Sequence, residues 1–376
     1  MADGLVVLFK GHSQYGSVNA MVDQLAQALE RLGAPTAILD TRAADCVASA
    51  VALLRQRRVR LFLSLNGFGI PAAGQGAGFY AESAAPVLIY FVDHPAYHLS
   101  RLRAPLPRLI ATFPTAHHAD FCRRFIRDDI AIHHLPHATA AAAAAPWRGR
   151  DLALFLSASL MADPEPFRAQ WRQHGAEVAA RLDATVEAHD AAPTRPLHEI
   201  VLAALGGAAP PIEVLASYVI TVDTYLRSRV KLALAQALAH LPLTLCGEGW
   251  ARHAAPGQRA AFLPATPVAE TVAAMRRSKI VLNPLPPYYE SHERPLQAMV
   301  NGAVAAEGPN AAMAAAFPGG YLDLPADPRE AAAALEAALA AEGRLQAIAE
   351  AGHAACLAGH LWEHRAAEIL RLAAAG

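Results

Sequence analysis

Short apolar runs alternate with amphipathic segments over the first part of the chain. The runs predict strands near residues 5–9, 36–39, 61–65, 86–92, 109–113 and 130–135. Between the early runs, apolar residues recur at helical spacing over 18–32 and 43–55. Strands that alternate with helices indicate an α/β domain with a doubly wound parallel sheet, here over residues 1–140.

The same alternation resumes after an alanine-rich stretch, which we interpret as a linker near residues 138–150. Further strands are expected near residues 152–156, 241–245, 261–263, 279–282, 303–306 and 321–324. Helices are expected over residues 218–240, 267–277 and 294–301, with alanine-rich helices to the end. The pattern predicts a second Rossmann-like domain over 150–345, with a helical insertion at about 161–217.

Composition agrees with two folded domains, because the 376 residues are 54% hydrophobic and 17% charged. The formal net charge of −1 argues against binding driven by a basic surface, so neither nucleic acid nor an anionic membrane is expected as a partner. The four cysteines lie far apart, which fits a reduced, cytoplasmic setting. Because no run reaches about 18 uninterrupted apolar residues, no transmembrane segment is expected.

The sequence lacks the motifs of several common classes of metal site and enzyme. The histidines and cysteines show no H-E-x-x-H and no clustered ligand spacing, so a metal site is not expected. The P-loop of nucleotide kinases and the Gly-x-Ser-x-Gly elbow of α/β-hydrolases are also absent.

Polar side chains follow the predicted strands of the first domain, at the sheet edge where ligands bind in such folds. Asp93 and His94 follow one strand, and His12 lies in the first strand-to-helix turn. A carboxylate or an imidazole at this edge could take a proton from an acceptor hydroxyl. The alternative is that Asp93 caps the next turn, with His94 at the surface and His12 a polar loop residue.

The segment 279–307 carries a second candidate site, where a strand, a loop and a short helix precede another strand. The N–H groups at the start of that helix and the guanidinium of Arg294 could hold a diphosphate. Gln297 lies one turn further on and could bond a ribose hydroxyl. Arg229, with Lys231 second, is a phosphate candidate on the long helix before it. The alternative for segment 279–307 is an ordinary helix–strand unit with a solvated loop. The alternative for Arg229 and Lys231 is a basic helix face exposed to solvent.

The order of these motifs resembles the GT-B glycosyltransferases, most closely the group-1 transferases of the spore-maturation-protein type. That family carries a Ser…Arg…(Phe/Leu)-Glu-Ala…Gly pattern, and the matching residues here are Ser291, Arg294, Leu296, Gln297, Ala298 and Gly302. Gln297 stands where the family usually has a ribose-binding glutamate. The similarity extends to four other parts of the chain, at residues 135–137, 152–160, 225–234 and 245–250.

The resemblance implies two Rossmann-like domains that face a cleft, with helices at 346–376 crossing back to the first domain. It implies transfer of a sugar from a nucleotide-sugar, most often a UDP-sugar, to a hydroxyl of a glycan or protein acceptor, with no obligate metal or resident cofactor. A non-catalytic scaffold in a glycosylation complex and a sugar-nucleotide epimerase remain alternatives.

The candidate site residues, taken from the strand ends and from the resemblance together, fall into three groups. The donor-binding candidates are Ser157, Ser159, Arg229, Lys231, Gly247, Asn283, Ser291, Glu293, Arg294 and Gln297. The catalytic candidates are Asp93 and His94, with His12 in reserve. The acceptor-side candidates are Tyr15, Gly16 and Asn66.

Overall fold

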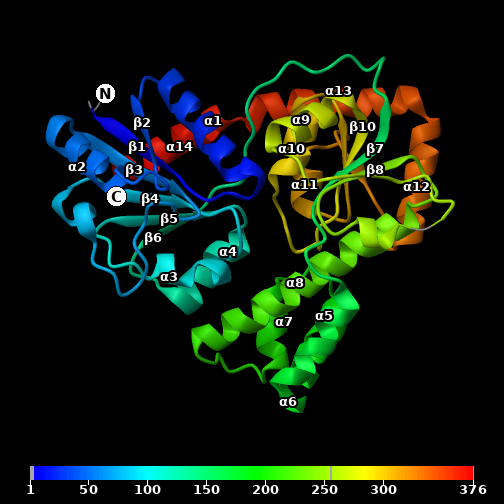
Figure 1. The fold of residues 1–376 in the computed structure, drawn as a ribbon, viewed down its shortest axis with the longest axis horizontal. Helices are drawn as coiled ribbons and strands as arrows, with labels where there is room; N and C mark the ends of the chain where they lie inside the picture. Colours follow the sequence, from blue (N-terminus) through cyan, green and yellow to red (C-terminus); the bar gives the residue numbers. More distant parts are fainter. Residues whose placement is uncertain (1–3, 255, 376) are drawn as a thin grey trace. The chain divides into compact units, whose positions relative to one another are not determined.

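The computed structural model describes residues 4–254 and 256–375 (Figure 1). By its internal contacts the chain divides into two compact units. The first runs up to Ala140 and resumes at His360, and the second spans Ala141–Gly359. Each unit contains a parallel six-stranded sheet with helices packed on it, which confirms the predicted fold class.

The first sheet has the strand order β2-β1-β3-β4-β5-β6. Its strands are β1 (Leu5–Lys10), β2 (Thr36–Asp40), β3 (Val59–Leu65), β4 (Val87–Tyr90), β5 (Leu109–Phe113) and β6 (Ala131–His134). The helices of this unit are α1 (Ser17–Arg31), α2 (Cys46–Gln56), α3 (Leu99–Leu102), α4 (Ala116–Phe121) and α14 (Trp362–Ala375). Short helical turns are η1 (Gln14–Gly16), η2 (Gly78–Glu82), η3 (Pro95–His98) and η4 (Cys122–Ile126).

Alternation along the strands explains why both faces of this sheet are covered. In β1, Val6 and Leu8 belong to the core formed with α1 and α14, whereas Val7 and Phe9 belong to the core on the opposite face. Successive strand residues point to opposite faces, so a continuous apolar run produces two cores. The carboxyl ends of the strands therefore remain as the edge where polar side chains gather.

The second sheet has the order β12-β11-β10-β7-β8-β9. Its strands are β7 (Leu152–Ser157), β8 (Leu243–Cys246), β9 (Ala261–Leu263), β10 (Ser278–Asn283), β11 (Val304–Glu307) and β12 (Leu322–Asp323). The helices of this unit are α5 (Pro164–Gln170), α6 (Ala176–Ala191), α7 (Leu197–Ala204), α8 (Ile212–Ala237), α9 (Val268–Arg277), α10 (Glu293–Val300), α11 (Ala311–Ala316), α12 (Pro328–Ala340) and α13 (Glu342–Gly359). Two 3-10 turns complete it, η5 (Trp171–His174) and η6 (Ala251–His253). Among the described residues, no helix is both long enough and apolar enough to cross a membrane.

A helical insertion separates β7 from β8 in the second unit. It consists of α5, α6, α7 and the first half of α8, the green helices of Figure 1. The α8 helix is 26 residues long and begins at Ile212, earlier than the predicted residue 218. Pro211 precedes its first turn, where the missing N–H of a proline has no helical partner to lose. One continuous helix thus joins the insertion to the sheet.

The last two helices belong to different units. The α13 helix packs against α10, α12 and β11, whereas α14 packs against α1. The crossover therefore lies near residue 360 and not at 346, where the sequence analysis placed it. In α14 the indole of Trp362 donates to Gln24 Oε1 at 2.8 Å and packs edge-on against Tyr90. These contacts tie α14, but not α13, to the first unit.

Arg150 fixes the segment that enters the second unit. Its buried guanidinium donates to the carbonyl oxygens of Ser278 at 2.7 Å and of Ala145 and Asn301 at 2.9 Å, and it lies over Trp147. Burial lowers the pKa of Arg150 to about 10. We expect Arg150→Ala to reduce the free energy of unfolding of this unit by about 2–4 kcal/mol, because several buried carbonyl groups lose a charged donor.

Denaturant titration measures this effect, with Arg148→Ala as the control because Arg148 lies just before Arg150 and is exposed. An unchanged unfolding midpoint for Arg150→Ala would contradict the assigned role.

Candidate functional site

Three cationic side chains gather near the carboxyl edge of the second sheet. Arg227 and Lys231 lie four residues apart on α8 and share one face of that helix. Arg294 lies at the start of α10, after the loop that follows β10. Each of the two arginines lowers the pKa of Lys231, so the three groups are close enough to repel one another. This arrangement favours an anionic ligand.

Lys231 contacts the loop after β7 and has a strongly lowered pKa. Its Nζ donates to the carbonyl oxygen of Ser159 at 3.1 Å. Burial, followed by the charges of Arg227 and Arg294, lowers the pKa of Lys231 to about 7, and the charge of Asp223 offsets only part of this. A lysine whose charge is opposed in the free protein regains that charge when an anion binds beside it.

Arg294 is held in place by side-chain amides and carboxylates. Its Nη1 donates to Asn283 Oδ1 at 2.5 Å, and Asn283 Nδ2 donates to Glu307 Oε2 at 2.6 Å. Asn283 ends β10 and Glu307 ends β11, and both are buried. Burial lowers the pKa of Arg294 and raises the pKa of Glu307 to about 7. Asn283 is therefore a link between Glu307 and Arg294, at the place where the sequence predicted a ligand contact.

The N-terminus of α10 is partly occupied by its own cap. His292 precedes the helix, and its Nδ1 accepts from the backbone N–H of Arg294 at 3.2 Å. The carboxylate of Glu293 lies 3.2 Å from the same ring nitrogen. Ser291 lies in the loop before this cap and is half-buried. Fewer backbone N–H groups are therefore free at the start of α10 than the sequence analysis predicted. The guanidinium of Arg294 is the main donor at this end of the helix.

Gln297 lies one turn after Arg294 on the same helix, as predicted. Its backbone carbonyl accepts from Asn301 Nδ2 at 2.8 Å. Within the described part of the chain, its side-chain amide has no hydrogen-bond partner. The amide is thus available to a ligand at the helix start.

The loop after β7 is shaped by glycines in the turn after β8. At Gly247 a Cβ atom would lie 2.4 Å from the carbonyl oxygen of Ala158, and the φ of this residue is +149°. Only glycine permits this approach. The hydroxyl of Ser159 accepts from the backbone N–H of Glu248 at 3.1 Å, and Ser157 ends β7. Gly247 therefore supports the loop whose Ser159 carbonyl accepts from Lys231 of α8.

Arg229 lies apart from the cationic cluster. Arg229 is two residues away from both Arg227 and Lys231 along α8, so its side chain points to a different face of the helix. There it forms an ion pair with Asp190 at the end of α6. The sequence analysis chose Arg229 and omitted Arg227, because the phase of the helix was not known. Their i,i+4 spacing was the signal that Arg227 and Lys231 act together.

Two buried carboxylates near the cluster were also missed. Asp223, one turn before Arg227, accepts from the hydroxyls of Tyr288 at 2.8 Å and Tyr289 at 2.9 Å. Glu307 also accepts from Asn310 Nδ2 at 2.9 Å. The position of Glu307 at a strand end was a usable signal. The position of Asp223 within an apolar helix face was not.

In the first unit, Asp93 lies at the carboxyl edge of the sheet after β4. Asn66, after β3, donates to Asp93 Oδ2 at 2.9 Å and accepts from the backbone N–H of Val92 at 2.9 Å. Asn66 has a φ of +51°, which an asparagine tolerates better than most residues. Asn66 therefore orients Asp93, whose side chain is 46% exposed.

The two histidines predicted at this edge differ in their surroundings. His94 is buried, its Nδ1 accepts from the backbone N–H of Ala96 at 3.1 Å, and its ring packs edge-on against Phe121. His94 is the N-cap of η3. Because its ring is buried, it is neither the surface residue nor the accessible base that the sequence analysis considered. His12 is exposed in the first turn. Tyr15 and Gly16 follow His12 with φ values of +54° and +75°, in the turn before α1.

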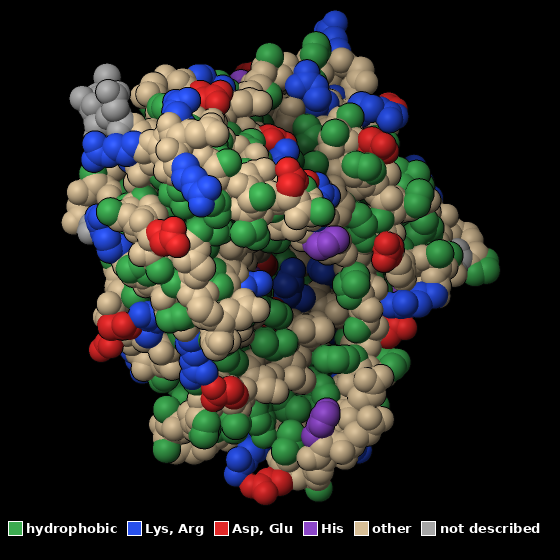
Figure 2. Space-filling view, turned by 60° about the vertical axis from the view of Figure 1, so that its left-hand side comes forward, with side chains coloured by type: hydrophobic (Ala, Val, Ile, Leu, Met, Phe, Trp, Pro, Cys, Tyr) green, Lys and Arg blue, Asp and Glu red, His purple; other side chains and the backbone are tan. Residues whose placement is uncertain are grey.

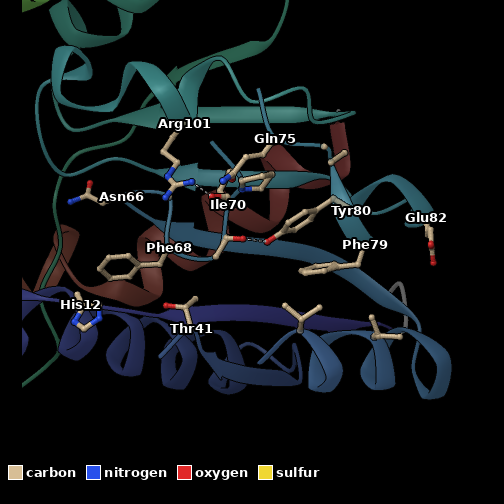
Figure 3. Close-up of a pocket in the computed structure, with 18 of the residues that line it drawn as sticks. His12, Thr41, Asn66, Phe68, Ile70, Gln75, Phe79, Tyr80, Glu82 and Arg101 are labelled. Carbon is tan, nitrogen blue, oxygen red and sulfur yellow. Dashed lines mark hydrogen bonds between the residues drawn. The ribbon is translucent and has the colours of Figure 1, made fainter. Parts of the chain in front are cut away.

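His12 lies beside a large cavity of about 890 Å³ in the first unit (Figure 3). The aromatic rings of Phe68, Phe79 and Tyr80 line it, and Figure 3 shows Arg101 beside the backbone of Ile70, to which it donates a hydrogen bond. The loop that forms this wall packs closely on β1. At Gly69 a Cβ atom would lie 2.5 Å from the ring of Phe9, so the loop requires glycine here.

Lys and Arg side chains lie interspersed with Asp and Glu over the face shown in Figure 2, in keeping with the small net charge. Among the described residues, no group of three or more His, Cys, Asp or Glu side chains is arranged to hold a metal ion.

Solved structures with the same architecture cover almost the whole chain. Sucrose-phosphate synthase (tll1590) from Thermosynechococcus elongatus is 13% identical, with 98% of each chain covered and a TM-score of 0.59. A glycosyltransferase from Rickettsia africae is 9% identical, with 99% of this chain and 98% of that chain covered and a TM-score of 0.56. Anabaena Alr3699/HepE, solved with UDP and glucose, is 12% identical over 100% of both chains, with a TM-score of 0.52. The chain has the GT-B fold.

Residues 227–371 of this GT-B chain match the glycosyl transferase-like protein family. The matched region begins at Arg227 and includes Lys231, Arg294 and Gln297. A search of curated protein sequences found no match. The family match therefore covers the part of the second unit that carries the cationic cluster.

Proposed function

We propose that this chain is a glycosyltransferase that uses a nucleotide-sugar as its donor. The observation that carries the proposal is the group of Arg227, Lys231 and Arg294 near the carboxyl edge of the second GT-B sheet. When a glycosidic bond to a nucleoside diphosphate breaks, negative charge develops on the leaving phosphate. Cations fixed beside that phosphate stabilise the transition state more than the ground state.

The remaining donor contacts follow from the same geometry. Gln297 lies one turn beyond Arg294, and its unoccupied side-chain amide would bond a ribose hydroxyl. The loop with Ser157 and Ser159 would lie against the phosphates. UDP is the first nucleotide to test, because the Anabaena protein of the same fold was solved with UDP and glucose. Three cations supply the positive charge, so we propose transfer without an obligate metal.

The acceptor belongs to the first unit in this proposal. Asp93, oriented by Asn66, would accept the proton of the attacking hydroxyl, with His12 as the second candidate. The cavity beside His12 would hold the rest of a glycan or protein acceptor. His94 is not retained as the base, because its ring is buried and engaged as a cap.

Nucleotide binding is the first prediction of this proposal. We expect UDP and UDP-sugars to raise the melting temperature of the purified chain, by an amount that grows with ligand concentration over Kd. GDP, CDP and dTDP serve as comparisons, each with magnesium and with EDTA. The same shift in both solutions supports the metal-independent proposal, whereas no shift with any nucleotide would contradict a donor site.

Product analysis separates the alternatives. A transferase hydrolyses the donor slowly without acceptor and faster with it. An epimerase interconverts free UDP-sugars, and a scaffold does neither. Gln297, in place of the usual glutamate, is the feature that keeps the scaffold alternative open.

A further inference from the structure

A second cavity, of about 400 Å³, lies wholly within the second unit. Its walls come from the end of α6, from α8 and α12, and from the loops that follow β10, β11 and β12. Proline, leucine and alanine side chains form most of the lining. The helical insertion therefore contributes one wall, which no ordinary strand–helix–strand unit would supply.

The cavity has few polar groups, of which His189, Asn283 and Glu307 are buried, whereas the Asp190–Arg229 pair lies partly in solvent. His189 is 3% exposed, and within the described residues its Nε2 has no hydrogen-bond partner. Its Nδ1 lies 3.2 Å from Asp190 Oδ1, and its ring packs edge-on against Tyr288. Burial lowers the pKa of His189, so the ring is neutral near pH 7. Because a carboxylate only accepts, Nδ1 carries the hydrogen and Nε2 is an acceptor.

The other polar groups also act mainly as acceptors. Asp190 pairs with Arg229, which neutralises the charge at this end. At the other end Glu307 accepts from Asn283 and Asn310. A ligand that satisfies this cavity is therefore neutral overall, brings several hydrogen-bond donors, and has apolar C–H faces to pack against the prolines. A sugar ring has these properties, whereas a phosphate or a carboxylate does not.

We propose that this cavity binds a neutral sugar ring, with one hydroxyl donating to His189 Nε2. The inference rests on the proposed function, because it assigns the sugar that accompanies the nucleotide. Glu307 and Asn283 line the cavity and also hold Arg294. A sugar bound there is thus one hydrogen-bonded link from the proposed diphosphate site. The ring is either that of the donor or a free sugar bound beside it.

The test compares UDP with UDP-sugars in His189→Phe, which keeps an aromatic ring against Tyr288 but removes Nε2. UDP-glucose, UDP-galactose and UDP-N-acetylglucosamine are titrated by calorimetry, and the tightest is used. If the donor sugar occupies the cavity, its affinity falls about tenfold while that of UDP is unchanged. His174→Phe is the matched control, because His174 is an exposed histidine of the same insertion.

A second arm uses free glycosides, whose binding is detected by saturation-transfer NMR. Methyl glucosides, galactosides and N-acetylglucosaminides that bind the wild type but not His189→Phe identify a free sugar as the ligand. Ala233→Leu fills the cavity from α8 and should give the same loss without changing the histidine. This second variant decides the matter if His189→Phe does not fold.

The outcomes are distinguishable. If UDP binds but no variant changes either UDP-sugar or glycoside binding, the sugar pocket is overturned and the proposed function stands. If no nucleotide binds to the wild type, the proposed function fails. The glycoside titrations alone then test whether the cavity binds a sugar. Glycoside binding lost in both variants then supports the pocket, and no glycoside binding to the wild type overturns it.

Discussion

Replacing Arg294 with alanine should weaken nucleotide binding by about 100-fold or more. The guanidinium is partly buried near two other cations, where removal of one partner of a desolvated charge pair typically costs about 2–5 kcal/mol. A loss of about 3 kcal/mol already corresponds to more than 100-fold in Kd. Titration calorimetry with UDP, or with the nucleotide that binds best, measures the change.

The variant should nevertheless fold. Burial lowers the pKa of Arg294. The carboxylate of Glu293 partly opposes this shift, and repulsion by Arg227 adds to it, so the net effect opposes the charge of Arg294 in the free protein. Removing it relieves that repulsion, and its hydrogen bond to Asn283 is a smaller loss. Groups arranged for a ligand often reduce the stability of the free protein in this way. We therefore expect the melting temperature without nucleotide to change little.

Two further variants make the result specific. Arg277→Ala removes an exposed arginine of the same unit, which pairs with Asp151, and should leave UDP binding unchanged. Arg294→Lys keeps a charge but loses the planar pair of donors, so it should give an intermediate affinity. A folded Arg294→Ala that binds UDP like the wild type would contradict the proposed diphosphate site.

The sheet architecture could be predicted because its signals are local. Parallel strands buried on both faces are continuous apolar runs, and those at 61–65 and 109–113 match β3 and β5 at their carboxyl ends. Strand ends then mark the ligand edge, which is how Asn283 and Asp93 were found. The helical start at Arg294 was similarly visible from the polar loop and the apolar helix that follows.

The parts that were missed depend on contacts between distant segments. Arg229 points away from Lys231 because Asp190, 39 residues earlier, pairs with it. No local pattern encodes that contact. The burial of His94 depends on α4, whose Phe121 packs against its ring. The early start of α8 is a different case. Ile212, Leu215, Ala216 and Val219 follow the helical i, i+3, i+4, i+7 spacing, so the signal for this turn was in the sequence and was not used.

Nucleotide affinity should decrease as the pH rises above about 7. The pKa of Lys231 in the free protein is about 7, so most of its ammonium groups have lost their proton by pH 8. A bound diphosphate favours the charged form and raises this pKa. Between the free and the bound pKa, binding takes up a proton, and Kd rises by up to about tenfold per pH unit.

Calorimetry in buffers with different heats of ionisation counts the protons directly. We expect close to one proton taken up per UDP at pH 8 and fewer at pH 6. Lys231→Arg should bind without this uptake, because a guanidinium stays charged throughout the range. Lys231→Met should lose both the uptake and most of the affinity.

Glu307 must be separated from Lys231, because its pKa is also about 7. Its ionisation adds a negative charge near Arg294 and would also weaken phosphate binding as the pH rises. Glu307→Gln removes that contribution and keeps acceptor capacity for Asn283 or Asn310. If the uptake of a proton persists in Glu307→Gln and disappears in Lys231→Arg, Lys231 is the group that titrates. The opposite pattern would assign the pH dependence to the carboxylate, and an affinity independent of pH would contradict a diphosphate beside Lys231.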